Sequence, residues 1–366
     1  MGNWNFNRNP EYEKTVKKLA KLDLLERPSG SLHPHSYSVK NREAFIDWGL
    51  ALFVIRTAYR YWSEDNRKRE DEGLNRDLMY QTKKNIPFSI IPLDNDSVLL
   101  LLGIAPPVNA DYIIPQKYYN QDDCVPTLLH NLCHSDIKGK IPYYDGSQNS
   151  REKIWRWFIE KVKKDKKYTE LLGFSFSIVL NVPPASLEIL FKGIENISYS
   201  VSDFLDVFFT CYASTILNPL VHIANTKLMG DPFYSHELDG VLFEKTSKDL
   251  VIIETTAGHD KERLTNKVLS AFAFNSCCDL GSYNYLYLTF SPVAFRNERQ
   301  DGVVKQCLEN DFFQVIEPAS YLPSGTEVKE LLRKNKDEEI KRRMTNTFYS
   351  LINQFERELF RIKEKM

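Results

Sequence analysis

The sequence predicts an α/β protein with a mixed central sheet flanked by helices. Between residues 198 and 320, short apolar stretches of strand length alternate with longer stretches that have apolar residues at helical spacing. The 366 residues are 42% hydrophobic and 27% charged, which is typical of a globular chain. At this length we expect two domains followed by a short additional segment.

Residues 1–195 are expected to form a mixed α/β domain of unknown role. The expected elements are helices over residues 9–25, 42–62 and 151–172 and strands within residues 86–102 and 174–182. Asp94, Asn95 and Asp96 are typical turn residues, so residues 86–102 are expected to form two strands.

The clearer pattern begins near residue 196 and extends to residue 322. It predicts the order helix, three strands, helix, strand, helix, strand. The expected elements cover residues 202–217, 220–228, 236–244, 250–256, 261–275, 283–290, 302–310 and 312–317. Residues 323–366 are expected to form a charged helical tail.

Charge and hydropathy exclude several classes of protein. Lysine and arginine total 48 and aspartate and glutamate 49, so any nucleic-acid binding must come from local basic patches. The longest apolar run, residues 98–104, is too short for a membrane span. Residues 1–9 lack the pattern of a signal peptide, and the six cysteines form no regular framework. We therefore expect a cytoplasmic protein with no membrane partner.

Two carboxylates interrupt apolar strands and are the main candidates for chemistry. Asp239 lies within the apolar residues 236–243, and Glu254 lies within residues 251–256. Burying a carboxylate is costly unless it is paired or binds a cation. Two neighbouring strands could place both acids at one sheet edge, where they would attract a divalent cation. The alternation also permits the opposite arrangement, with both acids in solvent.

This combination resembles the PD-(D/E)xK superfamily, the nucleases with a restriction-endonuclease-like core. The resemblance rests on a helix, an acid-x-acid-Gly strand at residues 237–240 and a following strand that ends apolar-apolar-Glu. It implies that Asp239 and Glu254 bind Mg²⁺ or Mn²⁺. It also implies that Asp206, or Asp203 in its place, completes the metal shell from the first helix.

The sequence departs from this family at one position. The family's lysine, two residues after the second acid, is replaced by Thr256. Members of the superfamily can carry the lysine on the following helix, where Lys267 is the first candidate and Lys261 the second. Lys267 lies beside an apolar stripe, so its long side chain could reach back to the acids.

The expected function is therefore that of a magnesium-dependent endonuclease that hydrolyses phosphodiester bonds, with DNA as the expected substrate. Defence or repair is the setting that the resemblance suggests. The alternative is an inactive protein of the same fold that binds nucleic acid or mediates assembly. Residues 328–365 have a heptad-like scatter of apolar residues, which fits a homodimer and equally fits packing on their own domain.

Overall fold

The structure is a computed structural model of the 366-residue chain. The residues that it describes are 5–8, 10–27, 37–71, 88–102, 141–165, 176–183, 186, 197–217, 222–229, 235–244, 247–256, 267–269, 271, 275, 281–290, 309, 311–334 and 336–366.

The chain folds into two compact units, each made of segments that are distant in sequence. Unit 1 combines residues 1–45, 202–322 and 342–366, and unit 2 combines residues 46–201 and 323–341. This grouping differs from the sequence-based segments 1–195, 196–322 and 323–366. The physical reason is that both ends of the chain supply strands or helices to the fold built around residues 202–322.

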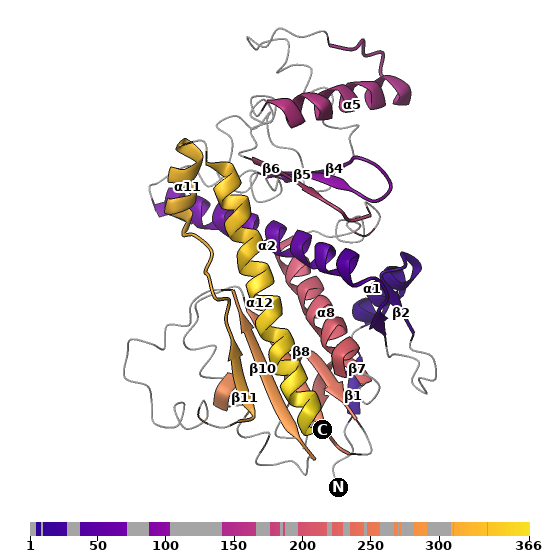
Figure 1. The fold of residues 1–366 in the computed structure, drawn as a ribbon, viewed down its shortest axis with the longest axis vertical. Helices are drawn as coiled ribbons and strands as arrows, with labels where there is room; N and C mark the ends of the chain where they lie inside the picture. Colours follow the sequence, from indigo (N-terminus) through magenta and orange to yellow (C-terminus); the bar gives the residue numbers. More distant parts are fainter. Residues whose placement is uncertain are drawn as a thin grey trace. The chain divides into compact units, whose positions relative to one another are not determined.

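Unit 1 is built on a six-stranded sheet with the order β1-β7-β8-β9-β10-β11 (Figure 1). Its strands are β1 (Asn5–Arg8), β7 (His222–Met229), β8 (Ser235–Phe243), β9 (Leu250–Thr256), β10 (Tyr283–Thr289) and β11 (Phe313–Ile316). Strands β1, β7, β8 and β9 pair antiparallel in succession, whereas β9, β10 and β11 pair parallel. The predicted α/β class with a mixed sheet is thus confirmed.

Helix α8 (Ile197–Leu217) covers one face of this sheet. Gly240 on β8 allows the close approach, because a Cβ built there would lie 2.0 Å from the Thr210 Oγ1 atom of α8. Helix α12 (Asp337–Lys365) packs along α8, with Phe209 and Phe355 meeting edge to face at a centroid distance of 5.4 Å (Figure 1). The apolar scatter of residues 342–366 is therefore used within unit 1.

The other face of the sheet carries a second layer of the core. Leu250, Ile252, Tyr285 and Phe313 form one buried cluster with Val268, which lies in the helical residues 267–269. Because side chains alternate between faces, Ile252 and Glu254 point to this face, whereas Ile253 and Thr255 point toward α8. The candidate site uses both faces of the sheet.

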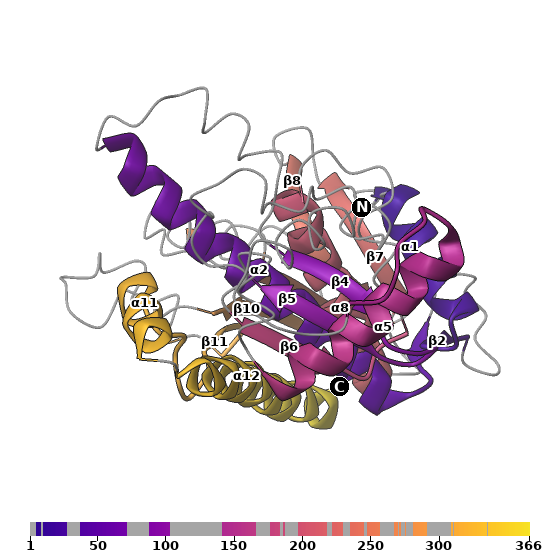
Figure 2. The same cartoon turned by 90° about the horizontal axis from the view of Figure 1, so that it is seen from above.

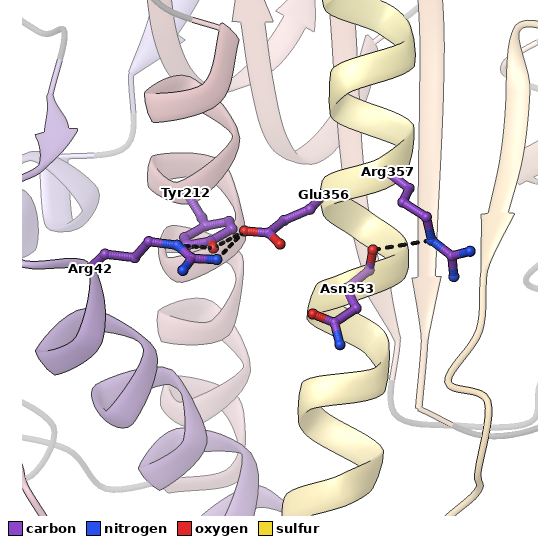
Figure 3. A network of polar contacts seen from close by, with 5 residues as sticks. All are labelled: Arg42, Tyr212, Asn353, Glu356 and Arg357. Carbon is purple, nitrogen blue, oxygen red and sulfur yellow. Dashed lines mark hydrogen bonds and ion pairs between the residues drawn. The ribbon is translucent and has the colours of Figure 1, made fainter.

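A polar network joins three residues of unit 1 that lie on three different helices (Figure 3). Arg42 begins α2 (Arg42–Asp71), and its Nη2 atom lies 2.5 Å from Glu356 Oε1 on α12. The Nε–H group of Arg42 donates to the Tyr212 hydroxyl of α8 at 3.1 Å, and that hydroxyl donates to Glu356. Near this network, α1 (Pro10–Lys21) leads into the short antiparallel pair β2 (Leu25–Glu26) and β3 (Ser38–Val39).

Unit 2 contains a small antiparallel sheet with β5 between β4 and β6 (Figure 2). In addition to residues 46–71 of α2, unit 2 contains β4 (Phe88–Pro92), β5 (Val98–Leu102), β6 (Phe176–Leu180), α5 (Gln148–Lys164) and α11 (Gly325–Arg333). The predicted hairpin around Asp94 is confirmed, since β4 pairs with β5 on either side of that turn. Helix α2 is longer than predicted and includes the charged residues up to Asp71. No helix within the described residues is both long and apolar enough to cross a membrane.

Candidate active site at the end of strands β8 and β9

Asp239 and Glu254 lie side by side on neighbouring antiparallel strands. The ladder pairs Gly240 of β8 with Ile253 of β9, so the next positions along are Asp239 and Glu254. There the Oδ2 atom of the Asp239 carboxylate accepts a hydrogen bond from the Thr255 amide at 3.0 Å. Sequence reasoning thus placed the two acids at one point of the sheet, as the structure has them.

Glu254 is almost completely buried, with 1% of its surface exposed. This excludes the arrangement in which it faces solvent. The Nζ atom of Lys267 lies 2.6 Å from Glu254 Oε2, and the lysine side chain is itself only 13% exposed. Besides this ammonium group, the Asp239 carboxylate lies within hydrogen-bonding reach of Glu254, and a hydrogen bond between the two acids requires that one of them hold a proton.

The charge balance at Glu254 favours a bound proton or cation. Burial raises the pKa of Glu254 to about 8, the neighbouring Asp239 carboxylate adds to the rise, and the Lys267 ammonium opposes it. One lysine therefore compensates only part of the cost of holding two carboxylates together. A divalent cation would compensate both acids at once.

Asp206 reaches this region from the other face of the sheet. The Thr255 hydroxyl donates to Asp206 Oδ1, and Asp206 is buried in α8 with 8% exposure. Thr255 therefore binds Asp206 through its side chain and Asp239 through its amide. The structure joins Asp206 to the acid pair through one intervening residue.

The remaining sequence-based candidates are only partly described. Lys261 lies outside the described residues, and Asp203 lies in α8 with a side chain that the structure does not describe. Thr256, at the position of the family's lysine, is buried at the end of β9 with 6% exposure. Of the two lysines considered, Lys267 is the one whose contact with Glu254 is described.

The donor set fits a hard divalent cation that keeps several ligands from water or substrate. Within the described part of the chain, no group of three or more His, Cys, Asp or Glu residues is placed to hold a metal ion. Asp239 and Glu254 offer two carboxylates, and Glu254 Oε1 is a buried oxygen without a donor among the described residues. Mg²⁺ is commonly held by one or two carboxylates together with waters and substrate phosphates.

Sequence reasoning missed two residues of this region, Thr255 and Tyr285. Tyr285 lies on β10 and pairs with Ile252 of β9. Ile252 precedes Glu254 by two residues, so the side chains of Tyr285 and Glu254 point to the same face of the sheet. Its hydroxyl is buried and has no hydrogen-bond partner among the described residues. The available signal was the alternation of Tyr283, Tyr285 and Tyr287 in a buried strand, which carries three hydroxyl groups to one face.

Comparison with known proteins adds no assignment at this point. The chain matches no family model, and no curated protein or solved structure is significantly similar to it.

Proposed function

We propose that the protein is a metal-dependent endonuclease of the PD-(D/E)xK type, with DNA as its substrate. The observation that carries the proposal is the contact of Lys267 with the buried Glu254 beside Asp239. A helix followed by three antiparallel strands, a helical segment and a parallel strand is the element order that the family resemblance implies. It supports a restriction-endonuclease-like core.

The roles of the residues follow from their chemistry. Asp239 and Glu254 would hold Mg²⁺ or Mn²⁺, which supplies charge to the scissile phosphate and makes water a better nucleophile. Lys267 would offset negative charge on the phosphoryl oxygens. The water oxygen bonds to phosphorus, the bond from phosphorus to the leaving oxygen breaks, one water proton passes to solvent and the leaving oxygen gains a proton.

Asp206 and Thr255 act on this site by positioning. The hydrogen bond from the Thr255 hydroxyl to Asp206 fixes the end of β9 against α8. That placement directs the Thr255 amide toward Asp239, whose carboxylate it orients. A direct bond from Asp206 to the cation is the alternative role that the family resemblance implies.

A second candidate is a nucleic-acid-binding protein that keeps this fold without cleaving. The observation that favours it is Thr256, which occupies the family's lysine position and is buried. Metal-dependent cleavage separates the two candidates, since a binder would retain affinity for nucleic acid and release no product.

The test is cleavage of plasmid and oligonucleotide DNA and of RNA, with Mg²⁺ or Mn²⁺, by wild type and by the variants Asp239→Ala and Glu254→Ala. Glu244→Ala is the matched control, because Glu244 follows the opposite end of β8 and accepts from Ser247. We expect cleavage by wild type and by the control, and none by the two site variants at unchanged folding. No cleavage of any substrate by folded wild type would reject the nuclease, and cleavage by both site variants would reject the site.

A further inference from the structure

Among the polar atoms buried on one face of the sheet, two lie on neighbouring strands and matter for the site. One is Oε1 of Glu254 on β9, and the other is the hydroxyl oxygen of Tyr285 on β10. Neither atom has a hydrogen-bond partner among the described residues. Buried polar groups in native proteins nearly always have a partner. Two such atoms on neighbouring strands and the same face therefore point to a common ligand.

The register of the sheet brings the two side chains together. Tyr285 pairs with Ile252 and Tyr287 pairs with Glu254, and all four side chains point to the face covered by the helical residues near Val268. The Tyr285 ring is fixed, because it stacks on Phe313 of β11 at a centroid distance of 5.0 Å. Its hydroxyl group is thus held in place on the face of the sheet that carries Glu254.

Electrostatics agrees with this placement. Burial raises the pKa of Tyr285 well above its usual value, and the Glu254 and Asp239 carboxylates both add to the rise. A phenol near two carboxylates keeps its proton and acts as a hydrogen-bond donor.

We propose that Tyr285 is a further positioning residue of this site, whose hydroxyl group and Glu254 Oε1 together hold one water molecule beside the acid pair. The water donates to the carboxylate oxygen and accepts from the tyrosine. The inference rests on the proposed function, in which this water is the one that attacks phosphorus. A buried water needs two to four polar partners, and these two groups supply the first two.

The substitution Tyr285→Phe tests the hydroxyl alone. Phenylalanine keeps the ring and its stacking on Phe313, so the fold is retained. The matched control is Tyr283→Phe, which removes a hydroxyl from the same strand and face at a position paired with Leu250, further from Glu254.

The measurements are Mn²⁺ affinity by calorimetry without nucleic acid, kcat and KM for cleavage, and the melting temperature in chelator. For Tyr285→Phe we expect about tenfold or greater loss of Mn²⁺ affinity or kcat, as substitutions behind metal ligands typically produce. We expect an unchanged KM and a melting temperature within a few degrees of wild type, because the ring keeps its packing and a single hydrogen bond to water contributes only about 1 kcal/mol. Tyr283→Phe should match wild type in Mn²⁺ affinity and kcat.

Each outcome decides between the two claims. Wild-type affinity and kcat in Tyr285→Phe, together with their loss in Glu254→Ala, would overturn the role of Tyr285 and leave the proposed function in place. Absence of Mn²⁺ binding by folded wild type would instead overturn the proposed function on which the inference rests. Equal losses in the Tyr283 and Tyr285 variants would also overturn the inference, because they would reflect packing of the strand.

Discussion

Unit 1 contains two polar clusters that use the same residue types in opposite ways. In the first, Arg42, Tyr212 and Glu356 join three helices, and the tyrosine hydroxyl both accepts from Arg42 and donates to Glu356 (Figure 3). In the second, Lys267 contacts Glu254, while one oxygen of Glu254 and the Tyr285 hydroxyl have no donor or acceptor among the described residues.

The difference separates a cluster that stabilises the fold from one that is prepared for a ligand. The first cluster is complete, and Arg42 is partly exposed, so solvent screens its charge. The second is buried and incomplete, a combination that costs stability and is expected where a ligand completes the arrangement. Three substitutions or conditions test this contrast.

The largest effect is expected for Lys267→Met, which keeps the length of the side chain and removes its charge. We expect cleavage to fall by about 10²-fold or more, because a positioned cation near the phosphate is lost. We also expect a loss of about 3–5 kcal/mol in the free energy of unfolding at pH 9 without metal, since Glu254 is ionised in wild type at that pH and would be left buried and unpaired. Chemical denaturation and single-turnover cleavage measure the two effects.

The double variant Lys267→Met with Glu254→Gln controls this prediction. It should recover most of the stability and none of the cleavage, because the buried charge is gone. If Lys267→Met were as stable as wild type at pH 9, the contrast between the clusters would be wrong.

A smaller effect is expected from pH in the presence of a chelator. Burial and Asp239 raise the pKa of Glu254 from 4.5 to about 8, so the folded state binds the proton more tightly than the unfolded state. The stability from this group is fully present below about pH 4.5 and is lost as the pH rises through about 8. The loss is on the order of a few kcal/mol.

Measuring the free energy of unfolding of wild type and of Glu254→Gln against pH isolates the contribution of Glu254. The variant should lack the pH-dependent loss of stability that Glu254 causes, so wild type should lose stability relative to the variant between pH 5 and pH 8. Parallel curves for the two proteins would show that Glu254 does not hold a proton more tightly in the folded state.

The smallest effect is expected for Tyr212→Phe in the complete cluster. Removing the hydroxyl deletes the bond from Arg42 and the bond to Glu356, at a cost of about 1 kcal/mol because solvent can replace part of them. Cleavage and Mn²⁺ affinity should not change. A loss of Mn²⁺ affinity at retained stability would mean that the two clusters are coupled.

The sequence predicted helix α8 and strands β7 to β11 of unit 1, whereas most of the helices expected over residues 261–275 and 302–310 lies outside the described residues. The strand expected over residues 250–256 matches β9, and Asp239 and Glu254 lie on neighbouring strands as expected, although apolar alternation alone left open whether they face the core or solvent. Lys267 was found because a lysine beside an apolar helical stripe can extend along buried surface.

Other features could not be read from local sequence. Residues 5–8 form β1 by pairing with β7, more than 200 positions away, and no local pattern specifies such a partner. The roles of Thr255 and Tyr285 depend on which face of the sheet meets α8 and which meets Val268. These are properties of tertiary packing, which patterns in a single sequence predict poorly.

The packing of α12 on α8 has a consequence for how the protein is made. Phe348, Leu351, Phe355 and Leu359 of α12 are completely buried, and Phe355 packs on Phe209. During synthesis at about 5–20 residues per second, the apolar face of α8 leaves the ribosome on the order of ten seconds before these partners exist. In that interval the nascent chain exposes a surface suited to chaperones, and a premature stop before residue 342 would leave it exposed permanently.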